Sequence, residues 1–351
     1  MSQQRTSCRE LMVFLETGSH KLRGKQAVIG LLLAMAVFVG AVFWMVAAAG
    51  EAASFTVSSA DYPWSAVGRL NRSTGGFCTG VLIGRRLVLT AAHCLYNQRT
   101  AHWLPADTIH FLPGYSRGEV QEHSLAQDYK IGAGYDPTAP PDLATKPSDW
   151  ALILLKDPVG DAAGYLGWKP MSRSLGLRLV EAGYRRSRPY LLSVRSDCEV
   201  RAWAGGTDLF FNSCGSIEGE SGAPLLEFIG GEFVVVGVQV ARVATNKPGG
   251  ALTAAVAASI DPLVGARLRF GHSISMDDLG GPQTRIPAWR RSPVETAQLL
   301  LARLGYDPGP ADGVMRAKTR RATQEFQQSR RLTVNGEISV DLVGRLLQAL
   351  P

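Results

Sequence analysis

Three short stretches of the 351-residue chain contain residue types that together can carry out nucleophilic catalysis. His93 ends the run Leu-Thr-Ala-Ala-His, Asp149 directly precedes an apolar run, and Ser221 lies between glycines in Gly-Glu-Ser-Gly-Ala-Pro. A serine hydroxyl is a weak nucleophile until an imidazole takes its proton, and a buried carboxylate can hold that imidazole in the required tautomer. We therefore expect Ser221 to act as nucleophile, His93 as general base and then acid, and Asp149 as the group that orients His93.

The glycines around Ser221 indicate a second part of such a site. A glycine at position 219 allows a turn in which the N–H groups of Gly219 and Ser221 point at one oxygen, the arrangement that stabilises an oxyanion. Gly222 is expected to leave room for the backbone of a substrate. A lone histidine, Asp-Trp step or Gly-x-Ser-Gly is common in inactive proteins, but their occurrence together in the order His, Asp, Ser favours the catalytic interpretation.

Residues 62–269 are built from short apolar runs separated by Gly, Pro, Asn and Asp. Examples are GVLIGRRLVLTAA, DWALILLK and EFVVVGVQVA. Runs of this length and composition are typical of strands in a barrel or sandwich. We expect an all-β domain, made of one unit or two packed halves, to position the three candidate residues.

This region resembles the chymotrypsin-like, or trypsin-like, serine proteases. The resemblance rests on Thr-Ala-Ala-His-Cys and Gly-x-Ser-Gly-x-Pro and on their spacing. It implies a double-barrel fold and a serine endopeptidase that cleaves proteins through an acyl-enzyme, with no cofactor. A cysteine seven residues before Ser221, its partner 16 residues upstream and the later stretch GVQVAR resemble the bacterial glutamyl-endopeptidase branch.

Cysteine usage is consistent with an oxidising compartment. Four cysteines, Cys78, Cys94, Cys198 and Cys214, allow three pairings, and the short spacings favour Cys78–Cys94 and Cys198–Cys214. The first pair matches the disulfide that the family places around its catalytic histidine. No cluster of His, Cys and Asp has the spacing of metal ligands, so we expect no metal, and Cys8 is expected to be a free thiol.

Four positions limit what the resemblance implies about activation and specificity. Glu220 stands where trypsin-like proteases have an aspartate that pairs with a newly freed amino terminus, and no activation sequence precedes Tyr62, so we do not expect such activation. Gly215 occupies the position where an aspartate would select basic side chains. Gln239 falls where the glutamyl branch has a histidine that contacts acidic side chains. A small or uncharged preference is the remaining expectation.

Three further histidines, His102, His110 and His123, are expected to be surface residues of an intervening loop.

The first 50 residues predict export from the cytoplasm. Residues 27–49 carry no charge and follow three basic residues; at 1.5 Å per residue a helix of this length spans roughly 35 Å, enough to cross a bilayer. We expect a cytoplasmic basic tail at 1–25 and a transmembrane anchor at 26–50, with the remaining chain in the bacterial periplasm or another extracytoplasmic space. The alternative is a signal segment that is cleaved, so that the protein is secreted.

The C-terminal part changes from strand to helix patterns. Residues 270–292 form a Gly/Pro-rich linker, and 293–351 predict three helices: one ending before Gly305, one over 318–328 and one over 340–350. Leu304-Gly305-Tyr306, Asp312-Gly313 and Phe326-Gln327 resemble the peptidoglycan-binding three-helix domain. The resemblance implies peptidoglycan as a partner.

A basic face on the second of these helices has two interpretations. Arg316, which replaces a glycine usual in that family, lies near Lys318, Arg320 and Arg321. These side chains either contact muropeptide carboxylates or form a solvated helix face, and we favour the solvated face. No aromatic residues are interleaved with them, which argues against nucleic acid.

The net charge of +7 is concentrated at the two ends of the chain, with +5 over 285–351 and +3 over 1–25. Taken together, the motifs predict a serine endopeptidase of envelope or exported proteins that is held at the cell wall. Two alternatives stay open: a catalytically silent wall-binding pseudoprotease, and a peptidase that acts on peptidoglycan peptides.

Overall fold

The computed structural model describes residues 54–139, 146–243, 252–257 and 292–351, and in the linker residues 270, 275, 278, 280–281 and 284–287. The expected cytoplasmic tail, the membrane or signal segment at 26–50 and Cys8 lie outside these residues. Among the described helices, none combines the length and apolar character needed to cross a bilayer.

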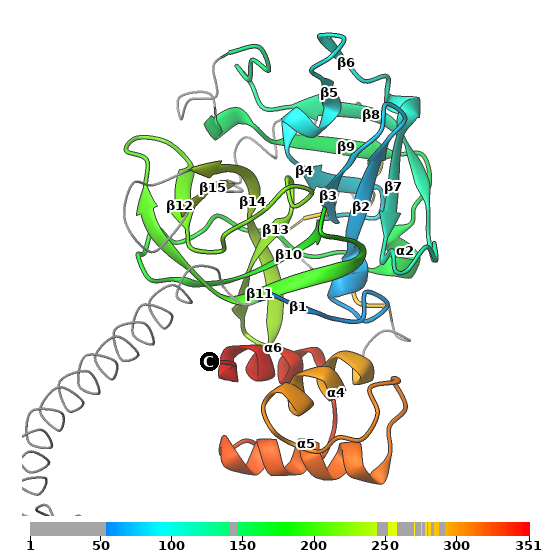
Figure 1. The fold of residues 1–351 in the computed structure, drawn as a ribbon, viewed down its shortest axis with the longest axis vertical. Helices are drawn as coiled ribbons and strands as arrows, with labels where there is room; N and C mark the ends of the chain where they lie inside the picture. Colours follow the sequence, from blue (N-terminus) through cyan, green and yellow to red (C-terminus); the bar gives the residue numbers. More distant parts are fainter. Residues whose placement is uncertain are drawn as a thin grey trace, which may run out of the picture. The chain divides into compact units, whose positions relative to one another are not determined.

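The first half of the β region is a closed barrel in the strand order β2-β3-β4-β9-β8-β7 (Figure 1). Its strands are β2 (Val67–Arg72), β3 (Phe77–Leu82), β4 (Leu87–Thr90), β7 (Ile109–Pro113), β8 (Ser124–Ile131) and β9 (Ala151–Leu155). Phe111 fills the interior next to Gly68, where a Cβ would lie 2.3 Å from its ring. The barrel is therefore closed around a large ring that only a glycine neighbour can accommodate.

The second half is a sheet in the order β1-β11-β10-β13-β14-β15-β12, and an additional pairing of β11 with β12 brings the sheet round on itself. Its strands are β1 (Phe55–Thr56), β10 (Arg178–Arg185), β11 (Arg188–Trp203), β12 (Leu209–Asn212), β13 (Pro224–Ile229), β14 (Glu232–Val243) and β15 (Leu252–Ala257). Because β1 pairs with β11, the sheet begins before residue 62, where we expected the domain to start.

Short elements connect these strands. They are the small hairpin β5 (Tyr96–Asn97) and β6 (His102–Trp103), the 3₁₀ turns η1 (Trp64–Ala66), η2 (Ala92–Leu95), η3 (Ala106–Thr108) and η4 (Lys146–Ser148), and helix α2 (Gly160–Ala163). The three sequence examples chosen for strand patterns fall on β3–β4, β9 and β14. The expectation of a β domain in two halves is thus confirmed.

Three helices follow the linker: α4 (Val294–Arg303), α5 (Ala317–Ser329) and α6 (Val340–Ala349). They agree with the three expected helices to within about two residues at each end. Helix α6 begins at Ser339, whose hydroxyl accepts the Leu342 N–H at 3.2 Å, a standard N-cap. Apolar side chains at helical spacing, such as Leu300, Leu301 and Phe326, are buried and form the core of this module.

Candidate active site

Two neighbouring strands of the first barrel bring His93 and Asp149 together. Strands β4 and β9 are paired, with Thr90 opposite Ala151. His93 follows β4 in the turn η2, and Asp149 immediately precedes β9 after η4. Because the strands are antiparallel, the end of one and the start of the other lie at the same edge of the barrel.

The ring of His93 is held by the carboxylate of Asp149. Its Nδ1 lies 3.1 Å from Oδ1 and 3.0 Å from Oδ2, and the backbone N–H of His93 donates to Oδ1 at 2.9 Å. Asp149 has no exposed surface, whereas His93 is half-buried. Burial acts to raise the pKa of Asp149, but the His93 ring and Lys146 outweigh it, and the pKa lies below its ordinary value. Asp149 therefore stays a carboxylate that orients the imidazole.

Two partners of Asp149 were missed by the sequence analysis. Lys146 donates from Nζ to Oδ2 at 3.0 Å, and Tyr135 lies close enough for the charge of this carboxylate to act on it. Burial first, and then the charge of Asp149, raise the pKa of Tyr135. A lysine three residues before an aspartate is too common a pattern to have indicated this contact.

The loop that carries Ser221 is attached to the first barrel through Thr79. The N–H of Thr79 donates to the Ser221 carbonyl at 2.9 Å, and its hydroxyl donates to the Gly219 carbonyl at 3.0 Å. The Cys94 sulfur lies 3.8 Å from the same Ser221 carbonyl. Since Cys94 follows His93 directly, these contacts place the backbone of Ser221 beside the histidine turn. Thr79 was not predicted, and a buried threonine in a strand gives no sequence indication of such a role.

The hydroxyl of Ser221 and the His93 ring are not joined by a hydrogen bond within 3.5 Å in the described part of the chain. Free active sites often hold this contact longer than it is in a substrate complex. The structure thus assembles the histidine–carboxylate pair and places the serine backbone next to it.

Backbone geometry at Gly219 forms one side of the expected oxyanion site. Gly219 has φ +97°, and a Cβ there would lie 2.6 Å from the Tyr184 carbonyl oxygen and 2.7 Å from the Phe77 ring. The preceding carbonyl, of Glu218, accepts the Arg186 N–H at 2.8 Å. In a trans peptide the N–H points opposite to the carbonyl, so the Gly219 N–H is directed away from Arg186. Neither this N–H nor that of Ser221 donates to another group in the described residues.

Gly222 lies against the first barrel. A Cβ on Gly222 would lie 2.1 Å from the Thr90 hydroxyl and 2.3 Å from the Thr79 carbonyl oxygen. The close approach of the first barrel therefore requires a glycine here, a reason separate from the expected room for a substrate backbone.

A pocket of about 270 Å³ opens next to Ser221. Ser216, Ile217, Gln239 and Val240 are among its lining residues. Gly215, expected in the specificity pocket, does not line it, whereas its neighbour Ser216 does. Gln239 is 2% exposed, and its amide donates to the Ala241 carbonyl at 2.8 Å. The buried polar residues of the lining, Ser216 and Gln239, are thus uncharged, whereas its two charged residues, Glu218 and Arg242, are exposed.

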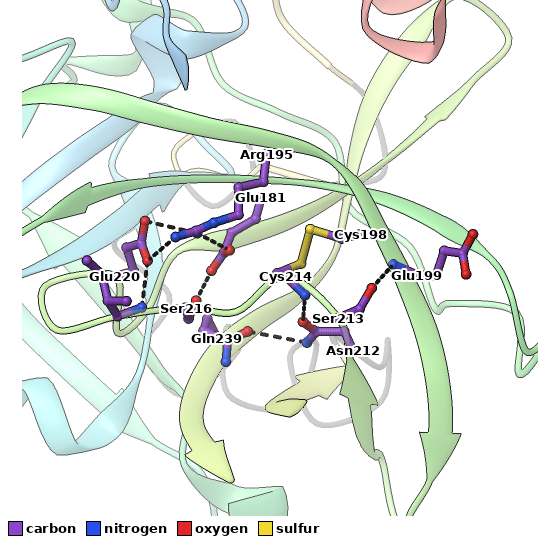
Figure 2. Close-up of a disulfide and its surroundings, with 11 residues drawn as sticks. Glu181, Arg195, Cys198, Glu199, Asn212, Ser213, Cys214, Ser216, Glu220 and Gln239 are labelled. Atoms are coloured by element: carbon purple, nitrogen blue, oxygen red, sulfur yellow. Dashed lines mark hydrogen bonds and ion pairs between the residues drawn. A yellow bond between two sulfur atoms is a disulfide. The ribbon is translucent and has the colours of Figure 1, made fainter. Parts of the chain in front are cut away.

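Glu220 is buried, and Figure 2 shows its carboxylate facing Arg195. Arg195 donates from both terminal nitrogens to its carboxylate at 3.0 and 3.1 Å, and Arg185 Nε lies 3.4 Å away. Arg195 was missed by the sequence analysis because it comes from β11, 25 residues earlier in the chain.

The four cysteines in the described residues form two disulfides, Cys78–Cys94 and Cys198–Cys214, as the short spacings predicted. Two side-chain groups in the described residues combine metal-ligating atom types, one around each disulfide. Because a disulfide sulfur is not a thiolate, neither group offers the ligand set of a structural zinc site.

The structure places His102 on β6, His110 on β7 and His123 directly before β8. His102 and His123 are exposed, and His110 is half-buried and stacks on His123 with Nδ1 2.9 Å from Nε2. Burial, followed by the proximity of His110, lowers the pKa of His123.

The helical module is organised by two buried glutamines. The side-chain oxygen of Gln298 accepts hydrogen bonds from the backbone N–H groups of Asp312 and Gly313 at 3.1 and 3.0 Å. The side-chain oxygen of Gln327 accepts hydrogen bonds from the backbone N–H groups of Asn335 and Gly336 at 3.1 and 2.9 Å. Each glutamine on a helix thus fixes a turn whose glycine has positive φ.

Three of the four basic residues on α5 and its preceding turn are paired within the module. Arg316 contacts Asp312 at 2.7 Å, Lys318 contacts Asp307 at 2.9 Å, and Arg321 contacts Glu325 at 3.0 Å. All three pairs are exposed to solvent. This arrangement fits a solvated helix face better than a preformed carboxylate-binding site.

The chain matches two family models. The trypsin model matches residues 54–258, more than half of the chain, and the peptidoglycan binding domain model matches residues 290–346.

Individual relatives cover smaller parts. A glutamyl endopeptidase of Bacillus licheniformis is 30% identical over 129 residues, which are 35% of this chain and 37% of that protein. Serine protease 23 of Rattus norvegicus is 29% identical over 193 residues, 46% of this chain and 45% of that protein. The chain thus spans less than half the length of these curated relatives.

A solved structure of Glu endopeptidase in complex with MPD superposes with a TM-score of 0.51 and 20% identity, covering 61% of this chain and 94% of that one. At 20% identity this similarity shows a shared fold. The family match, the fold and the disulfides agree: the chain belongs to the trypsin family of serine proteases, with a peptidoglycan-binding domain after the protease region.

Proposed function

We propose that the protein is a serine endopeptidase that cleaves peptide bonds of proteins at Ser221. The observation that carries this proposal is the hydrogen bond of the His93 ring to the buried Asp149 carboxylate, at 3.0 Å, beside the Ser221 backbone. This pairing fixes Nδ1 as the protonated nitrogen, so that Nε2 is free to accept a proton.

The reaction then follows from the positions of these groups. The Ser221 hydroxyl attacks the substrate carbonyl and its proton passes to His93 Nε2, while the carbonyl oxygen becomes an oxyanion near the N–H groups of Gly219 and Ser221. The C–N bond breaks, the leaving amine takes the proton from Nε2, and an ester remains on Ser221. Water adds to this ester with His93 again as base, which releases the acid and restores the serine.

The decisive experiment uses a fluorophosphonate probe and a protein substrate. The purified chain is expected to be labelled at Ser221 and to cleave casein, and S221A and H93A are expected to lose both properties while their melting temperatures stay close to that of the wild type. Labelling that persists in S221A would show that the nucleophile is another residue. An unlabelled, folded wild type would support the pseudoprotease alternative.

Side-chain selection in the pocket is expected to favour an uncharged residue. Ser216 and Gln239 are the buried polar residues of the lining and offer uncharged hydrogen-bonding groups, while the charged lining residues Glu218 and Arg242 are exposed to solvent. A peptide library varied at the residue before the cleaved bond checks this. A preference for glutamate or arginine at that residue would contradict it.

We further propose that the protein acts outside the cytoplasm and that residues 26–50 anchor it in the inner membrane of a bacterium. Two disulfides and an uncharged 23-residue segment after basic residues support this proposal. N-terminal sequencing of the membrane-extracted protein distinguishes an anchor from a cleaved signal. Recovery in the soluble cytoplasmic fraction would contradict both.

The helical module is proposed to hold the enzyme at peptidoglycan, so that envelope proteins are its substrates. The support is the family match over residues 290–346. If purified sacculi release peptide fragments in the presence of the wild type and not of S221A, the substrate is instead the peptidoglycan peptide itself.

A further inference from the structure

We infer that Arg195 is a positioning residue for the active site, an internal cation that holds the turn of Ser221 through Glu220 and a wall of the pocket through Glu181. The inference rests on the proposed function. In this role the Arg195 guanidinium pairs with Glu220, as the ammonium group of a freed amino terminus would otherwise do. Through Glu181 it also connects to the pocket.

The first step is the burial and bonding of Arg195. Its side chain is 2% exposed and lies between two carboxylates, as Figure 2 shows. It donates to Glu220 at 3.0 and 3.1 Å and to Glu181 at 2.7 Å. Glu181 on β10 is the direct cross-strand partner of Arg195 on β11. The position of the guanidinium is therefore fixed by the pairing of two strands.

The hydrogen bonds of Glu220 connect it to the turn that carries Ser221. The Glu220 carboxylate accepts the Ile217 N–H at 2.7 Å, and its backbone N–H donates to the Ile217 carbonyl at 3.1 Å. Its carbonyl accepts the Ala223 N–H at 2.9 Å. These bonds span the turn that contains Gly219 and Ser221, so the position of the carboxylate determines where their N–H groups point.

The third step leads from Arg195 to the pocket. Glu181 accepts a hydrogen bond from the Ser216 hydroxyl through the oxygen that does not face Arg195. Ser216 is 5% exposed and lines the pocket beside Ser221. One guanidinium thus fixes both the oxyanion turn and a wall of the substrate pocket.

The fourth step is a balance of charge. Arg195 faces Glu181 and Glu220, and Arg185 faces Glu220, so the buried cluster holds two positive and two negative groups when both carboxyl groups are ionised. An unpaired buried charge is costly, whereas a balanced and hydrogen-bonded cluster is tolerated. The cluster needs no additional ammonium group, and we expect activity that does not depend on freeing an amino terminus.

The test measures kcat, KM and the rate of fluorophosphonate labelling in the purified full chain. In R195M both kcat/KM and the labelling rate are expected to fall by about 10²- to 10³-fold, the effect of losing one oxyanion donor. The loss falls mainly on kcat because the oxyanion turn acts on the transition state. R195K keeps the charge but not the two-pronged contact, and is expected to lie between R195M and the wild type.

Two further variants separate positioning from folding. R201M removes an exposed arginine of the same strand that pairs with Glu199, and is expected to behave like the wild type. R195M/E181Q keeps the buried cluster neutral, and is expected to fold but to label as slowly as R195M. A cleavage site engineered directly before Ser54 allows a new amino terminus to be created there. Cleavage at this site is expected to leave kcat/KM and the labelling rate of the otherwise wild-type protein unchanged.

The outcomes are distinct. A folded R195M or R195M/E181Q that labels at the wild-type rate overturns the inference and leaves the proposed function intact. A large rise in rate after cleavage before Ser54 also overturns it, because the activating cation would then be the new ammonium group. A wild type that is folded but not labelled overturns the proposed function and the inference together.

Discussion

At the scale of single residues, the Asp149 carboxylate has more partners than an orienting role requires. Asp149 accepts from the backbone and ring of His93 and from Lys146. Each additional donor withdraws negative charge from the oxygens that face the imidazole. The strength with which Asp149 stabilises the imidazolium is therefore set in part by Lys146, which lies as close to Oδ2 as the ring does, at 3.0 Å.

We predict that K146M moves the acid limb of the kcat/KM pH profile upward by about one pH unit, because a nearby positive charge that disfavours the imidazolium is removed. K169M, which removes a lysine paired with Glu227, serves as the control and is expected to leave the profile unchanged. A downward shift of the acid limb in K146M would contradict this interpretation.

At the scale of elements, strand pairing converts distant sequence positions into neighbours. The pairing of β10 with β11 sets Glu181 opposite Arg195 in the buried interior. Burial raises the pKa of Glu181 to about 7; Arg195 opposes this effect and the nearby Glu220 carboxylate adds to it. Ser216 donates to Glu181, and Arg185 is the other charged group of the cluster. A carboxyl group in this position makes stability depend on pH.

The folded protein should lose stability as Glu181 loses its proton. Because the folded-state pKa of Glu181 is raised above its ordinary value of 4.5, its contribution to stability is fully present below pH 4.5 and is lost as the pH rises through about 7. The free energy of unfolding of the wild type should therefore fall relative to that of E181Q across this range. Denaturant unfolding of both proteins at a series of pH values measures it, and a constant difference would contradict it.

The disulfide between Cys198 and Cys214 stabilises the pairing of the second sheet. It joins β11 to the segment after β12, with a sequence separation of 16 residues. We predict that C198A/C214A lowers the free energy of unfolding by about 3 kcal/mol, because a loop of this length is no longer closed in the unfolded chain. Chemical denaturation of the oxidised wild type and the variant checks the loss, and equal stabilities would refute it.

At the scale of the whole molecule, a protease region and a wall-binding module are joined in one chain. Tethering an enzyme to an insoluble polymer raises its effective concentration near proteins that share this location, without any change in its active site. The two activities should therefore be separable by deletion.

We predict that S221A in the full chain sediments with purified sacculi, and that the same chain without residues 290–351 stays in the supernatant. When residues 290–351 are deleted from the wild-type chain, which keeps Ser221, kcat/KM on a short soluble peptide is expected to stay unchanged. Equal sedimentation of both chains would place the wall contact outside the helical module.

Much of the site could be predicted from local patterns. His93, Asp149, Ser221 and Gly219 each occur in a short stretch whose residue types are dictated by the chemistry or by backbone conformation. The short apolar runs between turn residues likewise indicated the strands, and helical spacing indicated α4, α5 and α6, because these patterns reflect which side of an element is buried.

Only the tertiary structure decided which distant groups meet at the site. Thr79, Lys146 and Arg195 contact the catalytic loops through strand pairing and burial, and nothing in their local sequence differs from that of ordinary strand or loop residues. The structure also places the Thr90 hydroxyl beside Gly222, and Ser216 lines the pocket where Gly215 was expected. The physical reason is that local sequence determines conformation and the side that is buried, whereas the partner of a buried charge is determined by which strands pair.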